Sequence, residues 1–282
     1  MERYMKGRAR LRGNKVPQSE AAARAALAAL PEADAHASYT AAWQLMRSEF
    51  FDDKVAGMTL LSDSVLTPAA SSPPPRSPSP LSAAPSASHE VICVTASLLD
   101  EVETLLDNQS FSGVNEWATC DALSSRVVAR HLAAHPEHAA RVLSWSHAPI
   151  ATSSVWKRRA GHVSFLRHIR LPASGRRSGW PSVVGDDLFG EGFYLDLISA
   201  CEAALDCSDR FAQLGAGWVL RYLLVLPDRA DVRTATKETL VRCAPKMSKE
   251  GMRYALEHCD DEQLRAKLLA KVPRAVSRRR RL

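Results

Sequence analysis

The sequence lacks the patterns that several classes of protein require. Strict alternation of apolar and polar residues is almost absent, so little β-structure is expected. No apolar run approaches the roughly 20 residues of a membrane-spanning helix, and no signal-peptide core begins the chain. The six cysteines form no C-x-x-C pair, which favours reduced thiols. We therefore expect a soluble intracellular protein without a membrane partner, located in the nucleus or the cytoplasm.

Helix-forming residues dominate what is present. Of the 282 residues, 46% are apolar, which is enough for a real core, and runs of Ala, Leu, Arg and Glu predict an all-α protein. The expected helices have about 10 to 18 residues and follow one another in pairs, a spacing typical of repeat architectures. The sequence thus predicts an α-solenoid of HEAT-like helical repeats with a concave basic face, although strict sequence repetition is not visible.

The boundaries of the expected helices follow from apolar periodicity, prolines and glycines. Pro17 fits a first helical turn, and Pro136 is expected to end a helix at His135. The predicted helices are Ser19–Leu30, Ala35–Arg47, Asp52–Ser64, Val91–Leu106, Val114–Ala134, Pro136–Trp145, Ser153–Ile169, Phe193–Leu205, Asp209–Leu226, Ala230–Cys243, Lys249–His258 and Glu262–Lys271.

Composition divides the chain into a repeat domain with additions. Residues 1–16 are predicted to form a basic N-terminal arm, residues 17–272 the HEAT-like repeat domain, and residues 273–282 a basic tail. Residues 67–88 are almost wholly Pro, Ser and Ala and predict a disordered insert. A second insert, over residues 171–188, is rich in Arg and Gly.

The net charge of +6 is unevenly distributed. Residues 1–16 carry +5 and residues 271–282 carry +6, which leaves −5 for residues 17–270. Within this mildly acidic body, Ala139–Gly185 contains eight Lys or Arg and no Asp or Glu. A run of one sign indicates a polyanionic partner, and a solvated basic face is the alternative.

One short stretch near the middle of the chain pairs an indole with a carboxylate. If Asn115–Asp121 is helical, Trp117 and Asp121 lie four residues apart on one face. An aromatic ring beside an anion suits a cationic ligand or transition state. The alternatives are a core tryptophan and an aspartate that caps a helix N-terminus.

Three histidines have helical spacing, but they do not predict a metal site. His131, His135 and His138 would share one face. Pro136 interrupts that helix, and no carboxylate or thiolate lies suitably between the histidines. We expect neither a metal nor another cofactor.

Four segments together resemble the DNA alkylation repair family, the HEAT-like-repeat alkylpurine DNA glycosylases of AlkD/AlkC type. Tyr4–Pro17 resembles the entry motif of the family, and Trp117 with Asp121 matches W-x-x-x-D. Trp156–Ala160 is similar to W-x-R-R-x-A up to the second arginine, and Gly217–Arg221 matches G-W-x-L-R. Departures are Leu214–Ala216, where the family has Lys-Ala-Ile, and the tyrosine after Arg221, where the family has Glu.

The resemblance implies an enzyme that hydrolyses the N-glycosidic bond of N3- or N7-alkylated purines in duplex DNA. Asp121 would stabilise the oxocarbenium-like sugar and position water. Trp117 and Trp218 would flank the lesion. The resemblance further implies phosphate contacts from a set of basic residues, namely Arg159, Arg158, Arg221 and Lys157.

Two other functions stay open at this stage. One is a non-catalytic HEAT-repeat binder of damaged or branched DNA, and the other is a HEAT-type scaffold whose arginines meet acidic protein partners. Salt-sensitive binding to duplex DNA favours either DNA-binding function over the scaffold. A monomer is expected in each case.

Overall fold

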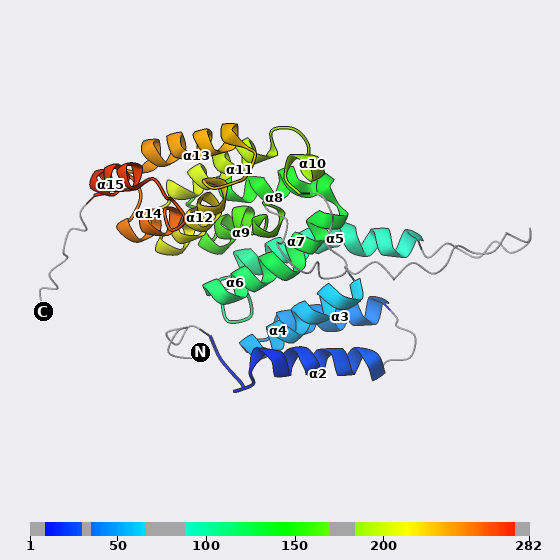
Figure 1. Cartoon of the computed structure of the whole chain (residues 1–282). Coiled ribbons are helices and arrows are strands. Elements are labelled where there is room, and N and C mark those ends of the chain that lie inside the picture. The colour runs from blue at the N-terminus through cyan, green and yellow to red at the C-terminus, as the bar shows by residue number, and fades with distance from the viewer. Residues whose placement is uncertain (1–8, 30–34, 66–87, 170–183, 274–282) are drawn as a thin grey trace, which may run out of the picture. The chain divides into compact units, whose positions relative to one another are not determined.

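The computed structural model describes residues 9–29, 35–65, 88–169 and 184–273, and within these ranges the chain is helical, without a strand. The one β-type contact there is an isolated bridge between Arg10 and Phe50. The predicted all-α fold is therefore confirmed. The described residues divide into two compact units, unit 1 up to Ala134 and unit 2 from His135 onward, and consecutive helices pack on each other within each unit (Figure 1).

Unit 1 contains the first five of the twelve predicted helices. Pro17 lies in the first turn of its first helix, as predicted, because the missing N–H of proline is not needed there. The predicted helix over 114–134 begins only at Trp117 and contains a π-helical turn. The elements are α2 (Val16–Ala29), α3 (Ala35–Met46), α4 (Phe51–Leu60), the π-helical turn η1 (Leu61–Val65), α5 (Ser88–Asp107), α6 (Trp117–Leu123), the π-helical turn η2 (Ser124–Val128) and α7 (Ala129–Ala134).

The core of unit 1 is built around α4. Helices α2 and α3 both pack against α4, and α6 contacts it from another side. Val55, Met58 and Leu61 are buried, as the helical apolar stripe predicted. Trp43 and Met46 are buried on α3, which packs against α4 within the same unit. This packing fixes the position of α4, which matters below because α4 also carries a buried lysine.

The end of the predicted basic arm is attached to the start of α4. The carbonyl of Arg10 accepts a hydrogen bond from the backbone N–H of Phe51 at 2.9 Å. Arg12 binds Asp53 through Nε and Nη2, both at 2.8 Å, and this pairing holds the pKa of the Asp53 carboxyl below its usual range. Arg10 forms an ion pair with Glu49. Two bases of the arm are therefore already paired within unit 1.

Unit 2 contains a short 3-10 turn followed by the remaining helices. Three of its helices begin and end at the residues that were predicted. The helix predicted over 153–169 ends earlier, at Val163, because Phe165 turns inward against Phe189 and Phe193, with ring centroids 5.5 and 5.3 Å apart. The elements are η3 (Pro136–His138), α8 (Ala139–His147), α9 (Val155–Val163), η4 (Leu166–His168), α10 (Asp186–Phe189), α11 (Phe193–Leu205), α12 (Arg210–Leu223), α13 (Ala230–Cys243), α14 (Lys249–Ala255) and α15 (Glu262–Lys271).

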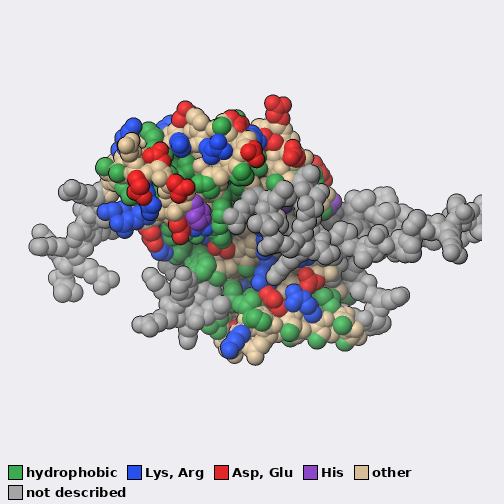
Figure 2. Space-filling view, viewed as in Figure 1, with side chains coloured by type: hydrophobic (Ala, Val, Ile, Leu, Met, Phe, Trp, Pro, Cys, Tyr) green, Lys and Arg blue, Asp and Glu red, His purple; other side chains and the backbone are tan. Residues whose placement is uncertain are grey.

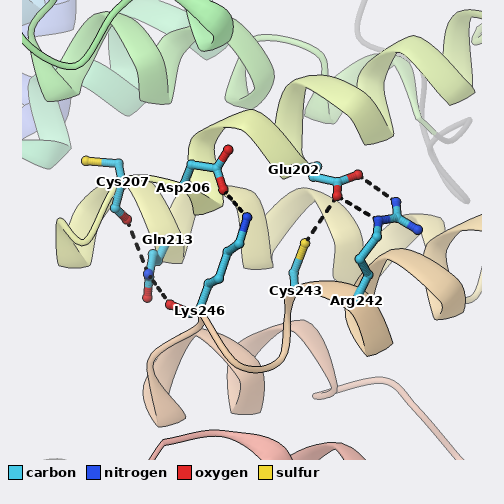
Figure 3. Close-up of polar contacts among 7 residues, drawn as sticks. All are labelled: Glu202, Asp206, Cys207, Gln213, Arg242, Cys243 and Lys246. Atoms are coloured by element: carbon cyan, nitrogen blue, oxygen red, sulfur yellow. Dashed lines mark hydrogen bonds and ion pairs between the residues drawn. The ribbon is translucent and has the colours of Figure 1, made fainter.

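Ion pairs connect α11 to α13 along one side of unit 2. Arg242 donates from Nε and Nη2 to the carboxylate of Glu202 at 2.8 and 2.6 Å, and Lys246 donates to Asp206 at 2.6 Å (Figure 3). The two acids lie four residues apart, and so do the two bases, so the acidic and the basic side chains pair at the same spacing. These pairs are half-exposed and stabilise the contact only weakly.

A buried amide makes a stronger connection at the same end of the unit. The Gln213 side chain donates from Nε2 to the carbonyls of Cys207 and Lys246 at 3.2 and 3.0 Å (Figure 3). Its Oε1 accepts from the backbone N–H of Ser248 at 2.7 Å. The side chain is 3% exposed, so three backbone groups of two loops depend on it for their hydrogen bonds.

The five cysteines whose side chains the structure describes are buried free thiols. Burial raises the pKa of Cys201 above its usual range, and burial together with Glu202 raises that of Cys243 to about 11. Neither is a reactive thiolate near neutral pH. The buried free cysteines are Cys120, Cys201, Cys207, Cys243 and Cys259.

Several predicted segments fall outside the described residues. The insert over 67–88 does so except for Ser88, which begins α5, and the insert over 171–188 does so except for its last residues, which enter α10. The tail over 273–282 lies outside except for its first residue. The predicted domain limits stay predictions. In the part of the chain that is described, every helix is too short or too polar to cross a bilayer.

Candidate functional site

In unit 1, Trp117 and Asp121 stand on α6 as the sequence predicted. The helix begins at Trp117 because Glu116, in an extended conformation, accepts hydrogen bonds from the backbone N–H groups of Ala118 and Thr119, both at 2.6 Å. The cap is therefore Glu116, which excludes the alternative that Asp121 caps this helix. Trp117 and Asp121 are both half-buried, so each presents part of its side chain to solvent in unit 1.

A buried lysine holds the loop that leads into α6. Lys54 of α4 is 3% exposed and donates from Nζ to the carbonyl of Met46 at 3.1 Å and to that of Gly113 at 2.9 Å. Burial lowers the pKa of Lys54 to about 8, and the charge of Glu116 opposes this shift. Because Met46 ends α3, the cation also lies at the favourable end of a helix dipole.

Glu116 is the second buried charge beneath the start of α6. Burial raises the pKa of its carboxyl, the hydrogen bonds from Thr119 and Ala118 lower it, and the nearby charge of Asp121 raises it further. Neither Lys54 nor Glu116 was among the residues predicted from the sequence. The signal for Lys54 was present, because it shares a helical stripe with Met58 and Leu61, where a lysine is out of place. Together these residues anchor the turn that carries Trp117 and Asp121.

A π-helical turn follows the candidate aspartate directly. The backbone N–H of Ser124 bonds to the carbonyls of Asp121 and Cys120, and η2 starts there. π-helical turns inside α-helices occur often at functional sites. In the same unit, Arg130 of α7 donates to the carbonyl of Ser62 in η1 at 2.7 Å, which satisfies one backbone acceptor of the other π-helical turn.

In unit 2, Arg158 is built into the contact between α8 and α9. Its Nη1 donates to the carbonyl of Ser146 at 3.1 Å and its Nη2 to that of Ala148, at the C-terminal end of α8. A Cβ added at Gly161 would lie 2.5 Å from Oγ of Ser146, so the two helices require glycine there. Arg158 is 4% exposed. Its predicted phosphate contact stays a prediction, and its described contacts stabilise the fold.

Lys157 and Arg159 occupy different positions on α9. Lys157 is half-buried, and its backbone N–H donates to the N-cap Ser154. Arg159 donates from Nη1 to the carbonyl of Phe211 in α12 at 2.6 Å. A Cβ at Gly215 would lie 2.9 Å from Nη1 of Arg159. The absence of a side chain at Gly215 therefore lets the Arg159 guanidinium lie directly against α12.

Beside Arg159, a buried histidine stays neutral. Burial lowers the pKa of His162 to about 3, and the charge of Arg159 lowers it further. Its Nδ1 lies 3.1 Å from Oγ of Ser146. An uncharged imidazole suits packing rather than acid–base chemistry.

Trp218 and Arg221 stand three residues apart on α12. Trp218 is half-buried, and among the described residues its Nε1 has no hydrogen-bond partner. Arg221 is 8% exposed, forms an ion pair with Glu257 and donates from Nη2 to Oη of Tyr222 at 3.1 Å. The family that the sequence resembles has a Glu at the position of Tyr222. In this chain Tyr222 accepts a hydrogen bond from Arg221, and Glu257 supplies the carboxylate that pairs with the arginine.

The predicted site residues therefore form two groups, each within one unit. Unit 1 brings Trp117 and Asp121 together on α6. Unit 2 brings Arg159 to α12, the helix that bears Trp218 and Arg221. Tyr254 of α14 belongs to the second group and was missed from the sequence: burial raises its pKa, and the charges of Arg221 and Arg159 oppose the rise.

Comparison with known proteins identifies the family of the chain. A family model described as DNA alkylation repair enzyme matches residues 1–259. The chain belongs to the DNA alkylation repair enzyme family. No curated protein and no solved structure matches the chain. The resemblance inferred from the four motifs is thereby confirmed, and repair of alkylated DNA, with DNA as the substrate, follows from the family.

The candidate residues of the two groups carry aromatic, carboxylate and guanidinium side chains. No group of three His, Cys, Asp or Glu side chains within the described ranges is placed to hold a metal ion. Acidic and basic side chains lie interspersed over the helices of unit 2 that Figure 2 displays. The concave basic face stays a prediction.

Proposed function

We propose that the chain is a DNA glycosylase that hydrolyses the N-glycosidic bond of N3- or N7-alkylated purines in duplex DNA. Family membership supports the substrate class. The observation that carries the proposal is the place of Asp121: half-buried, not a helix cap, and one turn from Trp117 on a helix whose start is anchored by buried charges.

The proposed chemistry needs little more than a well-placed anion. Alkylation at N3 or N7 makes the purine cationic and hence a good leaving group, so no strong general acid is required. As the bond to C1′ breaks, positive charge develops on the sugar, and a carboxylate stabilises this charge and orients the attacking water. Asp121 takes this role, and the ring face of Trp117 favours the same cation.

The second group of residues would bind the DNA itself. Guanidinium groups bind phosphate through paired hydrogen bonds. Arg159 of α9 is held by its bond to the carbonyl of Phe211 in α12, and Arg221 of α12 is held by Tyr222 and Glu257. Trp218 offers a half-buried indole beside them. We assign to these residues the positioning of the lesion-bearing strand. The predicted contacts of Lys157 and Arg158, the monomeric state and the intracellular location stay predictions.

Single-turnover excision from a duplex with one 7-methylguanine tests the proposal. We expect the wild type to release the base and Asp121→Asn to lower the rate at least about 100-fold with duplex binding unchanged. Asp107→Asn, an equal charge change on the exposed end of α5 in the same unit, is the matched control and should leave the rate unchanged.

The outcomes separate the candidate functions. Duplex binding without release by the wild type rejects the glycosylase and favours the non-catalytic binder of damaged DNA. No salt-sensitive duplex binding at all favours the protein-interaction scaffold. Equal loss of activity in Asp121→Asn and Asp107→Asn contradicts the role assigned to Asp121.

A further inference from the structure

The guanidinium of Arg221 is almost enclosed by its own unit. The side chain is 10% exposed, and its Cζ lies 4.8 Å from the ring centroid of Tyr222 and 4.6 Å from that of Tyr254. Its Nε is buried and, within the described residues, has no hydrogen-bond partner. The two rings fix the cation in place. The guanidinium cannot move toward a ligand, so a ligand that binds Arg221 must approach it at this fixed position.

This cation is already paired with a half-exposed acid. Glu257, in the turn after α14, forms the ion pair with Nη1 of Arg221, and its own side chain is 52% exposed. A carboxylate and a phosphate bind a guanidinium with the same fork of hydrogen bonds. Glu257 thus stands where an anion from solution would meet Arg221.

The surroundings place this ion pair among the residues assigned to DNA. On α12, Trp218 precedes Arg221 by three residues and Tyr222 by four, so the three share a helical face. Tyr254 is near enough to both Arg221 and Arg159 for their charges to act on its hydroxyl. His258, next to Glu257, lies 5.8 Å from Tyr222 between ring centroids.

We propose that the Glu257 carboxylate occupies, in the DNA-free protein, the position in which a DNA phosphate binds Arg221, so that duplex binding must displace Glu257. Glu257 then limits the affinity for DNA. It keeps the buried guanidinium of Arg221 paired in the free protein, and it weakens DNA binding because a DNA phosphate must displace it. The inference rests on the proposed function only in taking Arg221 as a DNA-binding residue.

Helix α14, which precedes the turn that carries Glu257, offers a matched control. Glu250 of α14 forms an ion pair with Arg210, and both of these side chains are 53% exposed. Replacing either glutamate by glutamine changes the net charge equally and at equal exposure. Only Glu257, however, covers a buried guanidinium. In Glu257→Gln the amide oxygen still accepts from Arg221, which keeps the arginine in place while removing the competing charge.

The test is binding of an undamaged fluorescent duplex, measured by anisotropy over a range of salt concentrations. We expect Glu257→Gln to lower the dissociation constant about tenfold more than Glu250→Gln does, equivalent to one charge-assisted contact of about 1.4 kcal/mol. In an Arg221→Met background, Glu257→Gln should give no more than the gain seen for Glu250→Gln.

Equal gains in Glu257→Gln and Glu250→Gln would show a general charge effect and overturn the inference. Weaker binding in Glu257→Gln would overturn it too, because the carboxylate would then hold Arg221 in its binding position. Glu257→Ala repeats the test if the glutamine variant unfolds. Since no base is released in this assay, the inference can stand when the glycosylase proposal fails, and the reverse holds as well.

Discussion

Replacing Lys54 by methionine is expected to destabilise the contact that anchors α6. Methionine fills similar volume but leaves the carbonyls of Met46 and Gly113, now bonded at 3.1 and 2.9 Å, without a donor. Each buried unsatisfied acceptor costs about 1–3 kcal/mol, and removal of the ammonium desolvation returns part of this. The buried charge of Glu116 also loses the opposite charge that acts on it. We expect a net loss of about 3 kcal/mol at neutral pH.

The loss should grow with pH, which distinguishes a buried charge from simple packing. Burial lowers the pKa of Lys54 from 10.5 to about 8. Below pH 8 the lysine is protonated in both the native and the unfolded chain, and the cost of burying the charge is present in full. Between pH 8 and 10.5 the unfolded chain binds more protons than the native one, so this group makes the wild type more stable as pH rises. The methionine variant lacks that gain.

Urea unfolding followed by circular dichroism measures both effects. The free energies of unfolding of wild type and Lys54→Met would be measured near pH 7 and at about pH 9.5. The other titrating groups contribute equally to both proteins, so their contributions cancel in the difference between the two free energies. Lys246→Met removes an exposed lysine paired with Asp206 and should change stability by less than about 1 kcal/mol. A difference between wild type and Lys54→Met that stays constant or narrows with rising pH would refute the reasoning.

Two further predictions concern unit 2. Gln213→Leu leaves three backbone groups of two loops without partners and should cost about 3 kcal/mol, seen as a drop in Tm of roughly 6–12 °C by calorimetry; an unchanged Tm would mean that water replaces the amide. Cys201 and Cys243 should be alkylated far more slowly in the native protein than in urea near pH 8, because burial raises both pKa values. Mass spectrometry of iodoacetamide-treated protein measures this, and equal native and unfolded rates would contradict it.

Helix limits were largely predictable because their causes are local. Phe193–Leu205, Ala230–Cys243 and Glu262–Lys271 agree exactly in both limits, since apolar periodicity, prolines and turn residues act within a few positions. The predicted helix over 153–169 failed at its C-terminal end for a non-local reason. Phe165 packs against rings more than twenty positions away in the chain, and that contact outweighs helix continuation.

The candidate site was predictable in its residue types and only partly in its surroundings. The motifs were sufficient to select Trp117, Asp121 and Trp218 as candidates and to identify the family, and the roles of these residues stay predictions. Arg158 and Arg159 are neighbours in one motif, yet their terminal nitrogens bond to different helices, α8 and α12. Sequence adjacency could not separate the two, because helical neighbours point about 100° apart and meet different partners.

The sequence by itself determined the all-α class, most helix limits, the family and the choice of candidate residues, because these depend on local periodicity and on motifs read in order. Only the tertiary structure decided which charges are buried. It placed Lys54 on two carbonyls, gave the cap of α6 to Glu116, and covered Arg221 with Glu257 from a turn 36 residues away. The cost of a buried charge depends on partners that folding brings together: Lys54 and Gly113 lie 59 residues apart in the sequence, and Arg221 and Glu257 lie 36 apart.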